Sequence, residues 1–222
     1  TLDAGYFMQH EAGTIAWHTR HLASRAGQGK TMVRARPATH GEGLEVLVYT
    51  PDKPFLFARI CAFFEQASFS IVDAKAHTTS NGYVLDTFQI VTQDLPEHYR
   101  EFITMIETAL ASAIESSTPL PTPRATRASR RVRHFPMQPE VHLEADATRQ
   151  RWLLTINASD RMGLLYRIAR VLALHGINLH LAKISTMGER VEDTFVIEGG
   201  NLASPPAQAQ LERDLLQAIA TA

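Results

Sequence analysis

The sequence predicts an α+β protein built from two copies of one module, each a four-stranded antiparallel sheet with two helices on one face. Three observations support this prediction: an internal repeat at a nearly constant offset, alternating apolar residues where each copy opens, and helical periodicity directly afterwards. The chain has 222 residues, of which 45% are hydrophobic and 20% charged. It is therefore long enough for two small domains with buried cores.

The repeat relates residues 31–115 to residues 139–221. Equivalent residues lie 108 positions apart (160 − 52), and the matched pairs are Asp52 and Asp160, Leu56 and Leu164, Arg59 and Arg167, Ile60 and Ile168, Ala74 and Ala182, and Lys75 and Lys183. Further on, Asp86-Thr87-Phe88 matches Asp193-Thr194-Phe195 at an offset of 107 (193 − 86). One residue is therefore missing near Gly82 and Gly188, which predicts a hairpin turn there.

Each copy opens with two strand-like segments. Apolar residues alternate over residues 44–49 and again over residues 152–157, and residues 32–35 and 140–143 just before them are also strand-like. A ferredoxin-like module carries its fourth strand last, after the second helix, but the second copy has no segment in that place. We therefore predict that the leading strand takes over this role and gives each copy the order ββαββα.

A turn and a helix follow these strands. The turns span residues 50–54 and 157–161, and their aspartates, Asp52 and Asp160, are expected to cap the helices. Apolar residues at helical spacing define one buried stripe per helix: Leu56, Ile60, Phe63, Phe64 and Ala67 in the first copy, and Leu164, Ile168, Val171 and Leu172 in the second. Both helices are expected to lie on the sheet.

A hairpin and a second helix complete each copy. The hairpin strands are predicted at residues 70–79 and 83–92, and at residues 177–187 and 191–198. The closing helices are marked by Phe102, Ile103, Ile106 and Leu110, and by Leu211, Leu215 and Ile219. The two copies are expected to bury their remaining apolar surface against each other.

The pattern divides the chain into four regions. Residues 31–115 are the first module, residues 139–222 are the second, and residues 116–138 are a Pro/Ser/Arg-rich linker between separable units. Residues 1–30 hold a helix over residues 9–22 and then a glycine-rich break, and we expect them to be the end of a preceding region. Because the first residue is Thr1, we take the chain as part of a longer protein.

Composition excludes several function classes. The net charge is −1, from 22 basic and 23 acidic residues, which gives no overall attraction to nucleic acid or anionic membranes. The single cysteine, Cys61, allows no disulfide and no cysteine-based metal site within the chain, and it fits a reducing cytoplasm. There is no signal peptide and no apolar run of about 18 residues that could span a membrane.

No catalytic pattern is present either. The sequence has no nucleophile elbow, no Walker-type glycine loop and no paired-carboxylate signature, so we expect neither catalysis nor a cofactor in this part of the protein. His18 and His21 lack a nearby third ligand and are interpreted as a solvated helix face. The arginine run, Arg124, Arg127, Arg130, Arg131 and Arg133, is typical of a solvated linker rather than of a nucleic-acid site.

Both copies resemble the ACT domain, because a turn like residues 160–165, Asp-Arg-Met-Gly-Leu-Leu, runs into a helix and then into residues 176–179, Gly-Ile-Asn-Leu. The whole chain resembles the C-terminal end of the family of bifunctional uridylyltransferase/uridylyl-removing enzymes of bacterial nitrogen control. That resemblance rests on Gly5-Tyr6-Phe7, Ile15-Ala16-Trp17-His18, residues 48–54 and residues 85–88.

The resemblance implies a regulatory role. In that family a nucleotidyltransferase domain uridylylates the PII signal protein, an HD-type hydrolase domain removes the group, and ACT domains sense L-glutamine. This chain would then be the sensor, with the catalytic domains of the same protein and PII as partners, and a divalent metal such as Mg would serve the full-length enzyme. Self-association into a homodimer stays open.

The candidate ligand site lies at the turn of the second copy. Free N–H groups and the positive end of a helix dipole favour a carboxylate at the turn formed by Asp160, Arg161, Met162, Gly163 and Leu164. Gly163 allows close approach, and Asn178 offers a donor and an acceptor. The first copy offers Asp52, Lys53, Phe55 and Ser70, but Pro54-Phe55 replaces Met162-Gly163 there.

Two other functions fit the same fold class. A free-standing tandem ACT regulator would bind an amino acid and a partner protein. An RNA-binding platform would need exposed aromatic residues on the central strands and a basic face, and the predicted strands carry little of either.

Overall fold

The computed structural model describes residues 4–23, 27–92, 99–124, 137–147, 150–187 and 190–220. The chain begins with the helices α1 (Ala4–Gln9) and α2 (Ala12–Leu22). The first copy contains β1 (Met32–Pro37), β2 (Leu44–Pro51), α3 (Leu56–Gln66), β3 (Ser70–His77), β4 (Tyr83–Val91) and α4 (Tyr99–Glu115). The second copy contains β5 (Glu140–Ala145), β6 (Trp152–Ser159), α6 (Leu164–Leu174), β7 (Ile177–Met187), β8 (Arg190–Gly199) and α7 (Pro205–Ala220).

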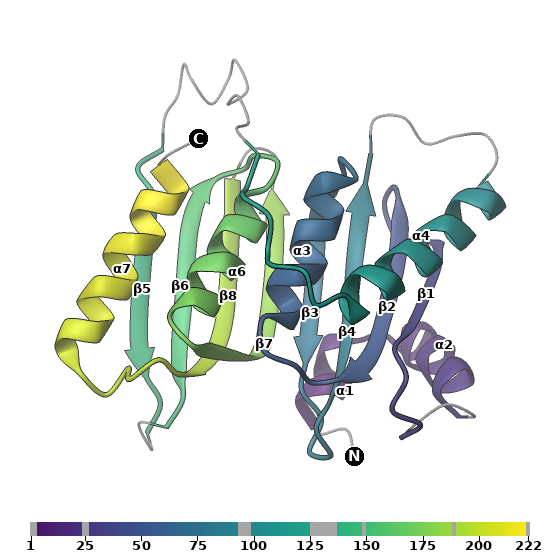
Figure 1. Cartoon of the computed structure of the whole chain (residues 1–222), viewed down its shortest axis with the longest axis horizontal. Helices are drawn as coiled ribbons and strands as arrows, with labels where there is room; N and C mark the ends of the chain where they lie inside the picture. The colour runs from purple at the N-terminus through teal and green to yellow at the C-terminus, as the bar shows by residue number, and fades with distance from the viewer. Residues whose placement is uncertain are drawn as a thin grey trace.

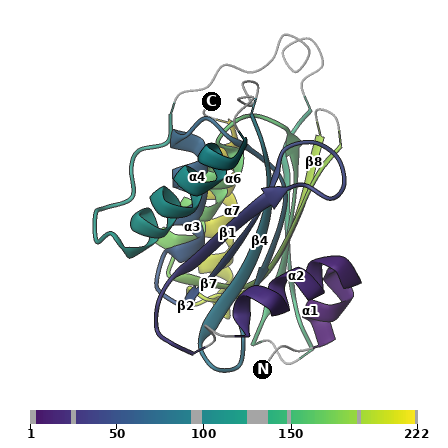
Figure 2. The same cartoon turned by 90° about the vertical axis from the view of Figure 1, so that its right-hand side faces the viewer.

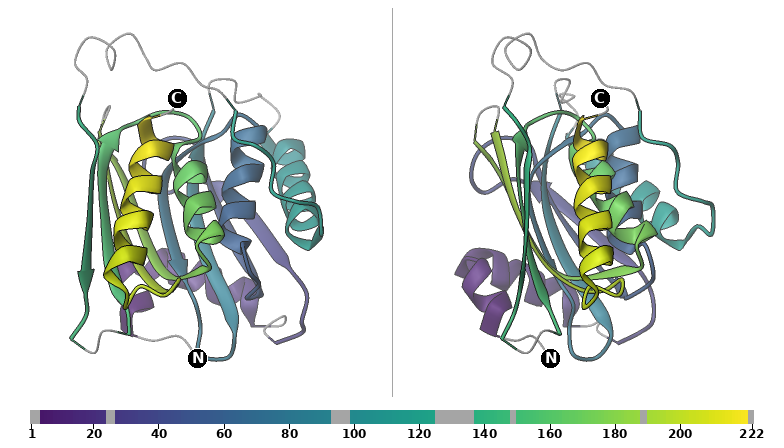
Figure 3. Two further views of the ribbon diagram at one scale, coloured as in Figure 1. Left: turned by 60° about the vertical axis from the view of Figure 1, so that its left-hand side comes forward. Right: turned by 90° about the vertical axis from the view of Figure 1, so that its left-hand side faces the viewer.

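Both copies contribute to one eight-stranded sheet with the order β1-β2-β4-β3-β7-β8-β6-β5. All neighbouring strands in this order are antiparallel. The helices α3, α4, α6 and α7 cover one face of the sheet, which we call the helix face (Figure 1). The helices α1 and α2 lie on the opposite face, the back face, over the first copy (Figure 2, Figure 3).

The leading strands occupy the two edges of the sheet. β1 pairs with β2, and β5 pairs with β6, so the predicted order ββαββα is confirmed in both copies. At the β1 edge the Glu107 carboxylate of α4 accepts the N–H of Ala35 at 2.8 Å and pairs with Arg34 at 3.3 Å. The contact gives the Ala35 N–H an acceptor on an edge strand, where unpaired N–H groups could otherwise pair with another chain.

The helix stripes are buried largely as predicted. Ile60 and Phe64 of α3 and Ile168 of α6 are fully buried, and so are Ile106 and Leu211 of the closing helices. Two predicted members of the α3 stripe differ, because Phe63 is half-buried and Ala67 is exposed. Ala67 lies beyond the last helical residue, Gln66, and helical spacing no longer applies to it.

The predicted helix caps are wrong. α3 begins at Leu56 after Phe55, and α6 begins at Leu164 after Gly163, and neither capping position makes a side-chain cap hydrogen bond. The chain turns through a left-handed residue before each helix, which places Asp52 and Asp160 further upstream than an N-cap residue.

The two copies meet where β3 pairs with β7. Lys75 lies opposite Lys183, its own counterpart in the repeat, and Ala74 and Ala76 lie opposite Ile184 and Ala182. This register relates the copies by a local twofold axis through the Lys75–Lys183 pair. The predicted burial between the copies therefore takes the form of a shared sheet, which crosses the boundary without a break.

The segment between the copies also differs from a solvated linker. Leu120 packs against the core, and the hydroxyl of Tyr166 on α6 donates to the carbonyl of Pro121 at 2.5 Å. Residues 116–124 thus run along the helix layer. The predicted basic run lies outside the described residues, except for Arg124, and so does the predicted turn at Gly188.

Residue character explains why α1 and α2 cover only the first copy. On its back face Leu47, Tyr49 and Leu85 form an apolar patch, which packs with Tyr6 of α1. The equivalent residues of the second copy are Thr155, Asn157 and Glu192, and none of them is buried. The first copy therefore needs an apolar cover on its back face, and the second copy does not.

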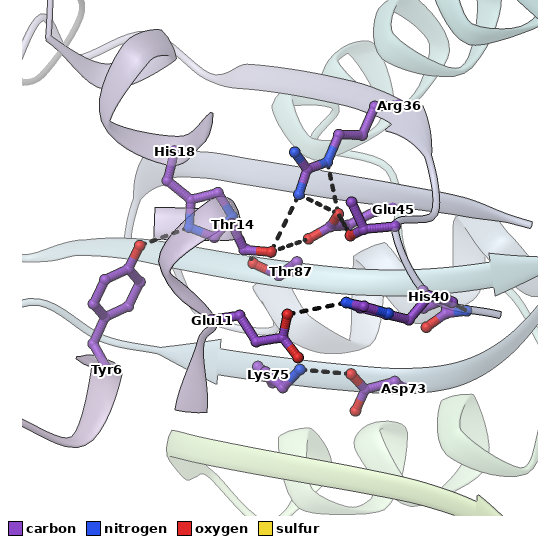
Figure 4. Close-up of polar contacts among 12 residues, drawn as sticks. Tyr6, Glu11, Thr14, His18, Arg36, His40, Glu45, Asp73, Lys75 and Thr87 are labelled. Carbon is purple, nitrogen blue, oxygen red and sulfur yellow. Dashed lines mark hydrogen bonds and ion pairs between the residues drawn. The ribbon is translucent and has the colours of Figure 1, made fainter. Parts of the chain in front are cut away.

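Buried hydrogen bonds of His18 hold α1 and α2 on the back face of the sheet (Figure 4). Nδ1 of His18 on α2 is hydrogen-bonded to the Tyr6 hydroxyl at 2.7 Å, and Nε2 lies 3.3 Å from the Thr87 hydroxyl of β4. The two helices are therefore joined to each other and to the sheet by one imidazole. The prediction of a single helix over residues 9–22 is corrected, since the chain bends at His10 and Glu11 between α1 and α2.

Acid should detach α1 and α2 from the sheet. Burial lowers the pKa of His18 from 6.5 to about 3 and that of His10 to about 4. A histidine whose pKa is lowered by folding stabilises the fold above its unfolded pKa, and this contribution is lost as the pH falls. For His18 the loss amounts to about 2 kcal/mol between pH 6.5 and pH 5.

We expect the emission of Trp17 to shift to the red over this pH range in a Trp152→Phe background. His18→Gln keeps a polar side chain of similar size but cannot be protonated, so it should reduce the shift to the part that His10 contributes. The same titration curve in both proteins would contradict this account.

Candidate functional site

Two pockets flank the β3–β7 pairing on the helix face, and each takes residues from both copies. The Asp160 pocket contains the predicted residues Asp160, Arg161, Met162, Gly163 and Leu164 together with Ser70. The Asp52 pocket contains the predicted residues Asp52, Lys53 and Phe55 together with Asn178. Ser70 and Asn178 are thus exchanged relative to the prediction, because each belongs to the pocket of the other copy.

The local twofold axis explains the exchange. Ser70 and Asn178 lie near the starts of β3 and β7, the two strands that pair across the boundary. Each strand therefore carries its first residues to the turn of the opposite copy. A ligand in either pocket would contact both copies at once.

Each pocket also contains a buried aspartate that sequence reasoning missed. Asp86 lines the Asp52 pocket and Asp193 lines the Asp160 pocket, at 2% and 1% exposure. The Asp86 carboxylate accepts the N–H of His77 at 3.1 Å, and Asp193 accepts the N–H of Ser185. The signal was visible in the repeat, because the two Asp-Thr-Phe matches place an aspartate at an inward position of both strands.

Burial raises the pKa of both Asp86 and Asp193 to about 7. A second aspartate adds to this effect in each pocket, Asp52 beside Asp86 and Asp160 beside Asp193. Burial also raises the pKa of Asp52, against the effects of the Lys53 N–H and of His180. Two facing carboxyl groups suit a cation, and an ammonium group would favour their charged forms.

The turns before α3 and α6 supply positive potential, opposite in sign to the charge of the aspartates. The first N–H groups of a helix have no intrahelical acceptor, and the helix dipole adds positive potential there. The residue before the helix is left-handed in both turns, with φ of 65° at Phe55 and 79° at Gly163. Each pocket therefore combines an acidic floor with an electropositive turn, and this arrangement suits the ammonium and carboxylate of an amino acid.

The pockets differ in size. The cavity volume is ≈ 30 Å³ in the Asp160 pocket and ≈ 60 Å³ in the Asp52 pocket. The predicted residues that line the Asp52 pocket are also exposed: Lys53 and Asn178 are exposed, and Phe55 is 46% exposed. The copy with the altered turn therefore has the larger cavity.

A third, more polar cavity of ≈ 280 Å³ lies on the back face at the bend between α1 and α2. In it Lys75 pairs with Asp73 at 2.8 Å, and Glu45 pairs with Arg36 at 2.6 Å (Figure 4). Glu11 and His40 form another pair across the cavity mouth. The acidic side chains Asp73 and Glu45 of this cavity are thus paired with basic side chains of the same chain.

The other residues considered at the sequence level form no site. The interpretation of a solvated helix face is wrong for His18, which is buried and engaged by Tyr6 and Thr87. Among the described residues no three His, Cys, Asp or Glu side chains are placed to hold a metal ion. None of the described helices is long and apolar enough to cross a membrane.

Comparison with known proteins agrees with this architecture. Residues 152–215, in the second copy, match the family model of the ACT domain. The bifunctional uridylyltransferase/uridylyl-removing enzymes of Ralstonia nicotianae and Cupriavidus metallidurans are each 49% identical over 99% of this chain and 26% of their own length. That of Cupriavidus pinatubonensis is 46% identical over 98% of this chain.

The chain thus spans about a quarter of the length of these curated relatives. Among solved structures, an aspartate kinase from Synechocystis aligns over 95% of this chain and 40% of its own, with 13% identity and a TM-score of 0.44. This likeness is too distant to bear on function.

Gly163→Ala should destabilise the protein by about 1–2 kcal/mol. The left-handed backbone at this position disfavours a Cβ, and an added Cβ would collide with the Glu65 carboxylate. Gly13→Ala is the matched control, because Gly13 is helical and has open space around it, so alanine should stabilise there by up to about 1 kcal/mol. Urea unfolding measures both changes, and a loss of equal size at both positions would rule out the steric explanation.

Proposed function

The chain is an ACT-containing regulatory region of the family of bifunctional uridylyltransferase/uridylyl-removing enzymes, and we propose that it senses L-glutamine and shifts the balance between the two activities. The observation that carries the proposal is the pair of pockets at the β3–β7 boundary, each with an acidic floor and a helix start. The substrate of the full-length enzyme in this proposal is the PII signal protein. Its catalytic domains would use a divalent metal such as Mg and act in the cytoplasm.

The chemistry of glutamine fits the pocket polarity. Its ammonium group would lie between the facing aspartates, Asp52 and Asp86, and its carboxylate would face the N–H groups at the start of α3. Asn178 comes from the other copy and can both donate to and accept from the side-chain amide. This pairing of amide with amide would favour glutamine over glutamate.

The position of the pockets supports a regulatory effect. A ligand that touches both copies stabilises the arrangement in which it makes more contacts, and the population of that arrangement rises with ligand concentration. The helices α1 and α2 precede the first module and dock on the back of the same sheet, where Thr87 neighbours Asp86 in β4. We propose that this contact carries the change toward the catalytic domains.

Calorimetry with L-glutamine on the 222-residue chain tests the sensor role. We expect a saturable heat at or below millimolar ligand. We expect no heat with D-glutamine, because its side-chain amide cannot reach Asn178 while its ammonium and carboxylate occupy the two ends of the pocket. Circular dichroism verifies folding. A folded protein without heat at millimolar L-glutamine would refute the proposal for this region.

Glutamine affinity should depend on pH through Asp86. Its pKa is about 7 in the folded chain, and an ammonium ligand requires the charged form, so binding releases a proton at lower pH. We expect the affinity to fall by about tenfold from pH 8 to pH 6. Asp86→Asn should weaken binding by about tenfold or more and remove this pH dependence. A wild-type affinity that is equal at both pH values would exclude Asp86 as the partner of the ammonium group.

A further inference from the structure

The Asp160 pocket and the Asp52 pocket differ at one pair of equivalent residues, which lie on α3 and α6. Glu65 of α3 lines the Asp160 pocket, and its counterpart in the repeat, Ala173 of α6, lines the Asp52 pocket. Each residue therefore faces the turn of the opposite copy. A long acidic side chain reaches into one pocket, and a methyl group borders the other.

Glu65 extends its carboxylate to the turn that precedes α6. An added Cβ on Gly163 would overlap Oε1 of Glu65, which places this oxygen directly against the turn. The same oxygen accepts the N–H of Arg124 at 3.0 Å. The residue is only 2% exposed, and its Oε2 makes no hydrogen bond within the described part of the chain. A buried carboxylate thus lies where a ligand carboxylate would have to bind.

The surrounding charges suit a carboxylate at this point. The positive charges of Arg167 and Arg124 act on Glu65 and oppose the effect of burial, which raises its pKa. Nε of Arg161 and Nε of Arg167 are buried and unbonded within the described residues. The guanidinium group of Arg167 is therefore a charge partner of the Glu65 carboxylate.

The segment between the copies holds Glu65 in place. Pro121 accepts the Tyr166 hydroxyl, and the Arg124 carbonyl accepts Nη2 of Arg167 at 2.5 Å. Both contacts tie the segment to α6, and the Arg124 N–H then meets Glu65 of α3. One short stretch of chain therefore connects the first helices of the two copies across the Asp160 pocket.

We propose that Glu65 is a built-in substitute for the ligand carboxylate, which closes the Asp160 pocket and leaves the Asp52 pocket as the amino-acid site. This inference rests on the proposed sensing of an amino acid and goes further, because it assigns one ligand to each chain and names its pocket. The pocket with the family-like turn is thus the closed one. The pocket with Phe55 in place of the turn glycine is open because Ala173 leaves its carboxylate end free.

Calorimetric stoichiometry with L-glutamine tests the assignment on the 222-residue chain. We expect one ligand per chain for the wild type and two for Glu65→Ala. Glu65→Gln is the matched control, because it keeps the length of the side chain and the acceptor for Arg124, so it should remain at one. The thermal midpoint of each variant verifies its fold.

The reciprocal substitution Ala173→Glu tests the open pocket. It should abolish binding, and the double variant with Glu65→Ala should regain one ligand, now beside Gly163. If Ala173→Glu does not fold, the crystal structure of Glu65→Ala with glutamine decides, because ligand density beside Gly163 is required.

Two ligands per wild-type chain, or one ligand in Glu65→Ala, would overturn the closure by Glu65 and leave the sensor role standing. No binding by either the wild type or Glu65→Ala would overturn both proposals.

Discussion

The antiparallel pairing of β3 with β7 is the interaction on which the remaining architecture depends. It joins two four-stranded units into one sheet and places Lys75 opposite Lys183 on the local twofold axis. Three of the four residues under α3 and α6 at this boundary are alanines, Ala74, Ala76 and Ala182, and the fourth is Ile184. The two helices can therefore lie side by side above it. Both pockets exist only because this pairing brings each turn to the strand start of the other copy.

The duplication explains how the pockets became different without loss of the fold. The scaffold residues of the two copies remain equivalent, including the buried pair Asp86 and Asp193. The residues that reach across the boundary have diverged, with Glu65 facing one turn and Ala173 facing the other. A symmetric dimer of identical modules could not make this distinction, because any substitution would change both of its pockets together.

Much of the fold could be predicted from the repeat and its periodicities. The order ββαββα, the hairpins and the buried helix stripes follow from local patterns, and local patterns survive without tertiary information. The caps at Asp52 and Asp160 could not be predicted correctly, since the left-handed residues Phe55 and Gly163 postpone the helix start. The sequence does not indicate a left-handed backbone at Phe55, because residues other than glycine rarely adopt it.

The site was less predictable than the fold. The site at the turn around Asp160 was predicted from residue chemistry. The position of Ser70 beside this turn depends on the pairing of β3 with β7. The alternation within a strand does not indicate which other strand it pairs with. Glu65 looks like an ordinary polar residue near the end of an amphipathic helix. Its role becomes visible only once Gly163 of the other copy lies against it.

The covalent connection between the copies has a consequence for how the region responds in the cell. Free modules that met through the same edge strands would have to dimerise, and their pockets would vanish on dilution. In this chain the second copy is always present at a high effective concentration, because the segment from residue 116 to residue 138 tethers it. The number of assembled pockets per chain is therefore independent of how much protein is made, and dilution does not take the pockets apart.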